Sequence, residues 1–195
     1  QVLTSDGTDI SWEDASGGGI TGLTGLVEND SIWLGDDPSG TTDTASNSVA
    51  LGTTALDAIT TGDNNTAIGY NALTANTTGY SNVAVGAGTL ATNTTSFHNT
   101  AIGLEALTAN TTGYSNIAIG NYALDANTTA SNNTAVGYLA LSANTTSTGL
   151  TAVGKGTLEV STGANNTAVG SNTLAANTTG ANNTAVGYNA GGAVT

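Results

Sequence analysis

The chain has 195 residues, with one basic residue against fourteen acidic ones, a net charge of −13 at pH 7 and no cysteine. This charge balance argues against nucleic acid binding, which requires clustered Lys and Arg. The absence of cysteine excludes a disulfide scaffold, a thiolate zinc site and a cysteine nucleophile. No apolar stretch approaches the length of a membrane span, so we expect no membrane insertion.

The first thirty residues stand apart from the rest of the chain. The segments 2–4 and 8–12 read as two short strands around a turn at Asp6-Gly7. The run Gly17-Gly18-Gly19 follows and is typical of a flexible linker. We therefore divide the chain into an N-terminal hairpin module with a Gly-rich linker, 1–30, and a repeat array, 31–195.

The array is defined by a phrase of Ala, then Val, Ile or Leu, then Gly, which returns almost every 17 residues. A degenerate copy, Trp33-Leu34-Gly35, precedes the regular ones in phase. One interval, from Gly154 to Gly170, is 16 residues, and we expect the register to survive this deletion. The glycines of the phrase are Gly35, Gly52, Gly69, Gly86, Gly103, Gly120, Gly137, Gly154, Gly170 and Gly187.

One repeat holds only about three apolar side chains of any size, so it gains a core only by stacking on its neighbours. Gly, Asn and Thr in every repeat disfavour helix. The pattern predicts an all-β fold, a β-solenoid (parallel β-roll) of about ten 17-residue coils. In Val83-Ala84-Val85, alternation puts the branched pair on one face and Ala on the other. We expect the branched pair in the core, with the Leu that follows each Gly by four residues.

Each coil also needs corners and turns. The glycine of the phrase suits a corner where positive φ or close backbone approach excludes a Cβ. Asparagines at one matched turn position can bond to one another along the rod. This predicted Asn ladder is Asn76, Asn93, Asn110, Asn127, Asn144 and Asn177.

Catalytic groups are scarce. His98 is the only histidine, it has no patterned acid near it, and it occupies a repeat slot that elsewhere holds Asn, so we interpret it as a turn residue. The carboxylates do not recur in phase, as a metal array would require. We expect no enzyme activity, no metal and no cofactor.

Three periodic surface features have competing interpretations. Tyr80, Phe97 and Tyr114 should stack, either as a carbohydrate-contacting strip or, as we favour, as a stiffening stack or trimer contact. Asn76-Thr77-Thr78 and its equivalents match a glycosylation acceptor, but repeat geometry explains these residues more simply. The Thr pairs suggest an ice-binding face, although adjacent Thr residues point to opposite sides of a strand.

The segment Ser46-Asn47-Ser48-Val49-Ala50-Leu51-Gly52 resembles the head repeat of trimeric autotransporter adhesins, which form left-handed parallel β-rolls with somewhat shorter repeats. Later copies such as 133–138 resemble repeat segments of phage tail fibres. The opening 1–12 is similar to a short module of predicted marine phage fibres. These resemblances imply a homotrimer in which the small side chains, Ala among them, approach a common axis.

The function implied is a structural shaft segment of an extracellular fibre, most of all a phage tail fibre that positions a host-receptor-binding tip. Its partners would be other fibre or virion proteins and a host surface glycan, and its location the virion tail fibre or the cell surface. The alternative is a bacterial surface adhesin head or a self-assembling surface filament, and a minor alternative is an ice-binding solenoid.

Overall fold

The computed structural model describes residues 2–5, 10–13, 32–34 and 45–191, with side chains described over 45–191. Every regular element in these ranges is a β-strand, so the all-β prediction is confirmed. In the described residues there is no helix with the length and hydrophobicity that crossing a membrane requires.

Strands β1 (Val2–Ser5) and β2 (Ile10–Glu13) pair antiparallel, with Val2 opposite Glu13 and Ser5 opposite Ile10. Both strands expected in the opening segment are therefore present. The turn at Asp6-Gly7 and the glycine run at 17–19 lie outside the described residues.

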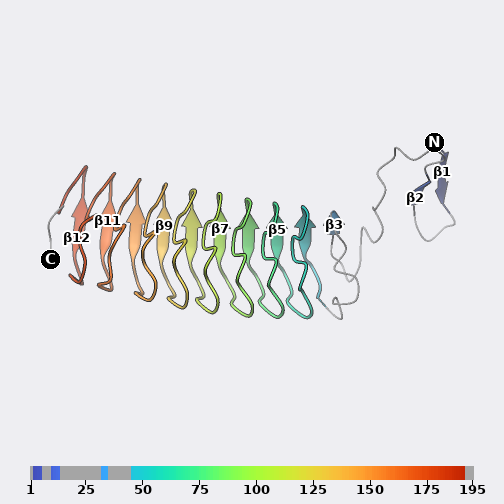
Figure 1. Cartoon of the computed structure of the whole chain (residues 1–195), viewed down its shortest axis with the longest axis horizontal. Coiled ribbons are helices and arrows are strands. Elements are labelled where there is room, and N and C mark those ends of the chain that lie inside the picture. The colour runs from blue at the N-terminus through green and yellow to red at the C-terminus, as the bar shows by residue number, and fades with distance from the viewer. Residues whose placement is uncertain (1, 6–9, 14–31, 35–44, 192–195) are drawn as a thin grey trace.

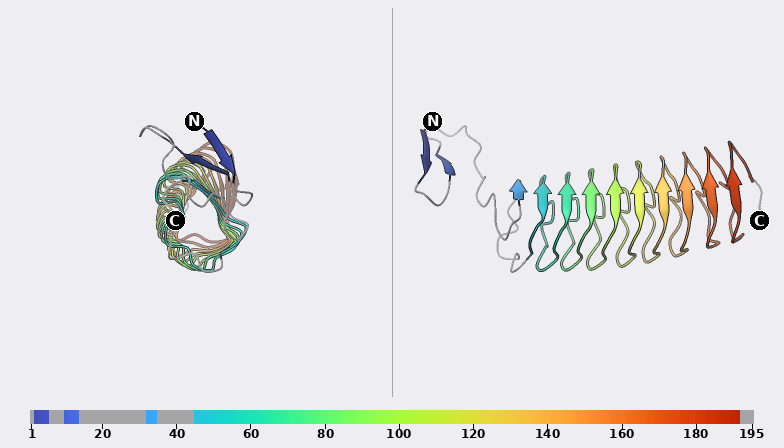
Figure 2. Two further views of the ribbon diagram at one scale, coloured as in Figure 1. Left: turned by 90° about the vertical axis from the view of Figure 1, so that its right-hand side faces the viewer. Right: turned by 180° about the vertical axis from the view of Figure 1, so that it is seen from behind.

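The array forms one parallel sheet of ten strands, stacked in chain order from β3 to β12 within the described residues (Figure 1). Seen along the rod, the successive coils superimpose (Figure 2). This is the β-solenoid predicted from the 17-residue period. The strands are β3 (Ile32–Leu34), β4 (Val49–Leu51), β5 (Thr66–Ile68), β6 (Val83–Val85), β7 (Thr100–Ile102), β8 (Ile117–Ile119), β9 (Thr134–Val136), β10 (Thr151–Val153), β11 (Thr167–Val169) and β12 (Thr184–Val186).

The register follows the phrase even where the sequence departs from it. Trp33 of the degenerate copy lies opposite Ala50, so β3 joins the sheet in phase, while Gly35 falls outside the described residues. Thr151 lies opposite Thr167 across the shortened coil. The missing residue is therefore absorbed in the turn, and the prediction that the register survives is confirmed.

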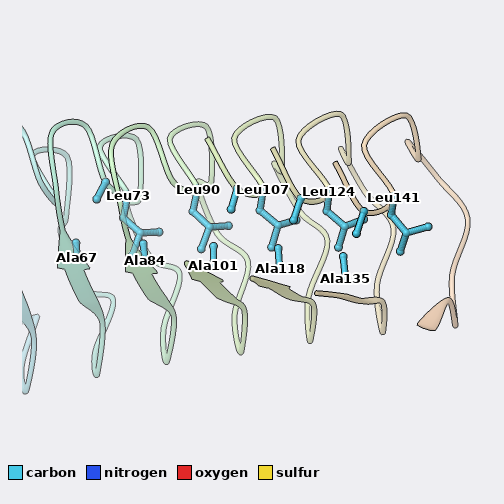
Figure 3. Packing of buried hydrophobic residues seen from close by; sticks show 14 of the residues in the cluster. Ala67, Leu73, Ala84, Leu90, Ala101, Leu107, Ala118, Leu124, Ala135 and Leu141 are labelled. Atoms are coloured by element: carbon cyan, nitrogen blue, oxygen red, sulfur yellow. The ribbon is translucent and has the colours of Figure 1, made fainter. Parts of the chain in front are cut away.

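Each coil of the core pairs an alanine of the strand with a leucine of the opposite wall. From β4 to β11 the strand alanines are buried, and so are the eight leucines that follow a corner glycine by four residues, as predicted for the leucines. Alanine and leucine side chains from opposite walls of the coil point toward one another (Figure 3). The leucines are Leu56, Leu73, Leu90, Leu107, Leu124, Leu141, Leu158 and Leu174, and all have φ between 49° and 56°.

The prediction that the branched residues fill this core was wrong. In strand β8, Ala118 is fully buried while Ile117 and Ile119 are exposed, and every strand from β4 to β11 has the same buried central alanine. A physical reason is width: the coil is closed by one leucine reaching across from the opposite wall, which leaves room for a methyl group and not for a branched side chain.

Glycine is required at the corner after each strand. From Gly52 to Gly187 these glycines have φ between 126° and 140°, a region that residues with a Cβ avoid. A Cβ on Gly120 would also lie 2.5 Å from the carbonyl oxygen of Gly137 in the next coil. Both backbone conformation and close stacking therefore exclude a larger residue.

We predict that Gly120→Ala lowers the free energy of unfolding by about 3–5 kcal/mol, because the new methyl group adds backbone strain and a clash with the next coil. Chemical denaturation followed by circular dichroism measures the loss. The matched control is Gly88→Asn, in a slot with φ 67° that holds Asn71 and Asn172 in other coils. It should change stability by less than about 1 kcal/mol, and an equal loss for both variants would contradict the argument.

Candidate functional site

The asparagines of the predicted ladder lie inside the turn side of the rod and are all buried. The amide of Asn93 donates to Oδ1 of Asn76 at 2.8 Å, and that of Asn127 donates to Oδ1 of Asn110 at 2.9 Å. Asn110 also donates to the carbonyl of Gly113 in its own turn at 2.9 Å. Each side chain thus fixes its own turn and ties it to the neighbouring coil.

A second ladder, which the sequence analysis missed, lies just before the strands. Asn99 donates from Nδ2 to the carbonyl of Gly113 at 3.0 Å, and its Oδ1 accepts the backbone N–H of Asn116 at 3.0 Å. The signal was the repeated Asn-Asn-Thr, whose second Asn has the inward parity of the strand alanine. The members are Asn65, Asn82, Asn99, Asn116, Asn133, Asn166 and Asn183.

Each ladder has one substituted position near the shortened coil. Leu150, just before β10, replaces a second-ladder asparagine, and Ser161, in the shortened turn, stands where the first ladder would continue. The backbone N–H of Leu150 still donates to Oδ1 of Asn133 at 2.9 Å, and the amide of Asn177 donates to Oγ of Ser161 at 3.4 Å. Contacts between coils are therefore kept at both substitutions.

The ladder position bears on the glycosylation hypothesis. Asn76 and its equivalents in the first ladder are buried, and their amides donate hydrogen bonds within the rod. In the folded rod these amides are therefore not accessible for glycan attachment. The first threonine of several pairs is engaged as well: Oγ1 of Thr77 donates to the carbonyl of Thr94 at 3.1 Å, and Thr111 repeats this to Thr128. These threonine hydroxyls therefore bond one coil to the next.

The aromatic residues lie as a stack on the surface. The ring centroids of Tyr80 and Phe97 are 5.0 Å apart at an interplanar angle of 5°, and those of Phe97 and Tyr114 are 5.1 Å apart at 11°. His98 has φ 58°, within a turn, and meets Phe97 edge-on. Both faces of the Phe97 ring are covered by its neighbours, so the stack presents mainly ring edges to a partner.

The outward face of the sheet carries the same kind of side chain in every coil from β4 to β12. Between β4 and β12, the two outer residues of each strand are Thr, Val, Ile or Leu, all partly or fully exposed, and none is charged. The first outer residue is Thr in six of these nine strands, whereas the last is always Leu, Ile or Val, so one continuous apolar strip runs along the sheet. Such a strip is uncommon on a monomer and is typical of a protein-protein contact.

Acidic groups do not gather into a site: over the described residues, no cluster of three or more His, Asp or Glu residues could hold a metal ion. Asp125 has an unusual environment for a carboxylate, because its Oδ1 is buried and has no hydrogen-bond partner. Burial raises the pKa of the Asp125 carboxyl, and the nearby charge of Glu105 raises it further, while hydrogen bonds from the backbone at 125 and 126 oppose the shift.

No family model matches the chain, and neither curated proteins nor solved structures include a significant match to it. Functional argument therefore rests on the surfaces and ladders of the rod itself.

We predict that Asn110→Ala lowers the free energy of unfolding by about 2–4 kcal/mol, because it removes two buried hydrogen bonds, one from the amide of Asn127 and one to the carbonyl of Gly113. These two groups keep only their bonds to Ala130 and from Asn99. The midpoint of urea unfolding measures this loss. The exposed Thr112 in the same turn supplies the control, Thr112→Ala, with an expected change below about 0.5 kcal/mol. Similar midpoints for both variants would show that the ladder contributes little.

We predict that Asp125→Asn raises the melting temperature at pH 7. Because the pKa of Asp125 is raised in the folded state, the folded protein is most stable while this carboxyl is protonated. It loses stability as the pH rises above the ordinary pKa of an Asp carboxyl, about 3.9, and through the raised pKa. Below the ordinary pKa, the melting temperatures of variant and parent should therefore be equal. Asp57→Asn, at the same repeat position but exposed, is the control for thermal melts across pH.

Proposed function

We propose that this protein is a structural shaft segment of an extracellular fibre, most of all a phage tail fibre, in which three copies run side by side and hold a receptor-binding tip away from the particle. The observation that carries the proposal is the uncharged face of Thr, Val and Ile that runs along the sheet from β4 to β12. In a chain with a net charge of −13, an apolar strip of this length calls for a covering surface.

A trimer supplies that cover. A narrow rod with a core of alanine and leucine has much surface for its volume, and association is a common remedy. With the alanines inside the coil, the branched residues of the sheet are the side chains that would meet at the common axis. This assignment replaces the alanine contact expected from the sequence.

The rod also has the mechanical properties of a spacer. Backbone hydrogen bonds join the strands, and further ones join turn to turn, as from Leu73 to Thr89 and from Thr77 to Thr94. Opening one coil therefore breaks bonds to both neighbours, so the coils resist bending and separation together. Repetition of one such coil sets length without requiring any chemistry.

The native mass by light scattering after size exclusion tests the trimer. We expect three times the chain mass of 18.9 kDa. The double variant Ile102→Lys with Ile119→Lys should give a single chain mass, because it places charges on the apolar face, whereas Thr112→Lys on the exposed turn should leave the trimer intact. A parent protein that elutes as a single chain would contradict the proposal, and polydisperse rods of very large mass would favour a self-assembling filament.

A further inference from the structure

Two rows of exposed apolar side chains border the outward face of the sheet. The first, which we name the entry row, is Tyr80, Phe97 and Tyr114, each three residues before a strand. The second, the exit row, is Tyr70, Leu104 and Tyr138, each two residues after a strand. In the coil of β7, which carries a member of each row, the strand residues lie between Phe97 and Leu104.

Neither row is required by the coil that bears it. The slot of Leu104 holds Ala87, Asn121 and Lys155 in other coils, and the slot of Phe97 holds Asp63, Ser131 and Thr148. The same backbone thus forms with small, polar or charged side chains at these places. The large apolar residues need a reason outside their own coil.

Their exposure leads to the same conclusion. Tyr80 and Tyr114 remain 40% and 42% exposed despite the stack, and Leu104 is 38% exposed. In the exit row, Tyr70 and Tyr138 are 60% and 47% exposed. Burying these side chains against an apolar partner would remove that surface from water at a gain of roughly 25 cal/mol per Å².

Symmetry indicates the partner. In a ring of three copies that all turn the sheet toward the axis, contacts are heterologous: the side of the face where strands begin in one copy meets the side where strands end in the next. Rotation about an axis parallel to the rod does not shift height. Phe97 and Leu104, which flank the same strand β7, are therefore level with each other, while Tyr70 and Tyr138 lie one coil away from Tyr80 and Tyr114.

We propose that the entry row of one chain packs against the exit row of the neighbouring chain, so that the partner of the aromatic stack is a second copy of this protein. The proposal rests on the proposed trimer and specifies its contact. The outward ring edges of the stack carry the positive side of the aromatic quadrupole and suit the face of Tyr70, while Leu104 adds an aliphatic contact. Tyr138 makes a T-shaped contact with Tyr122 of its own chain, with ring centroids 6.3 Å apart, and lends the row its remaining exposed surface.

The absence of cysteine from the chain allows a direct test. The double variant Phe97→Cys with Leu104→Cys is treated with a short bis-maleimide cross-linker and run on a denaturing gel. A covalent dimer or trimer on the denaturing gel can form only between chains, whatever links form within one chain, and these species are the expected result. The pair Tyr114→Cys with Leu104→Cys moves the entry position to the next coil and repeats the test.

The control pair is Phe97→Cys with Thr112→Cys, in which the exit-row position is exchanged for a residue of the exposed turn, and it should stay monomeric on the gel. Native mass is measured for every variant. A trimeric mass without cross-linking in either test pair overturns the contact but leaves the trimer standing, whereas a single chain mass for the parent protein removes both. Loss of the trimer in the row variants alone, with the control pair trimeric, supports the contact.

Discussion

Direct stacking of each coil on the next is the constraint on which the rest of the structure depends. Backbone groups bond from coil to coil in the strands and also in the turns, as from Ser81 to Asp63 and from Leu90 to Ala106. Coils this close leave no room for a Cβ between the corner of one and the carbonyl of the next. This close packing of coils requires a constant period of 17 residues, a glycine at the corner and a sheet in register.

The same stacking explains how so polar an interior can be stable. A buried asparagine is costly unless its amide is bonded, and here each ladder asparagine finds partners in its own turn and in the next coil. Asn93, for example, bonds to Asn76 below and to the turn carbonyl of Ser96. Where the shortened coil substitutes Ser161, the serine hydroxyl accepts the amide of Asn177 in place of an asparagine oxygen. The first ladder thus continues through the deletion with a different acceptor, while the sheet keeps its register.

The division between inside and outside carries the functional argument. Alanine and leucine exhaust the space inside the coil, so the branched residues of the strand face outward, where they form an uncharged apolar strip. Aromatic and aliphatic rows border this strip at places where other coils carry polar side chains. A surface of this kind fits a rod that associates with copies of itself, and the proposed fibre shaft follows from that fit together with the resemblance of the repeats.

Several features were determined by the sequence alone: the period, the corner glycines, the buried leucines and the stacking of Tyr80, Phe97 and Tyr114. Each follows from spacing, because side chains one repeat apart must lie above one another in a solenoid. Alternation in Val83-Ala84-Val85 separated two faces but did not say which one lies inside. The tertiary structure decided this through the width of the closed coil, which admits alanine opposite leucine and excludes a branched pair. The second asparagine ladder also could not be predicted from the sequence. The partners of Asn99 are backbone groups, and only the stacking of the coils brings them within hydrogen-bonding distance.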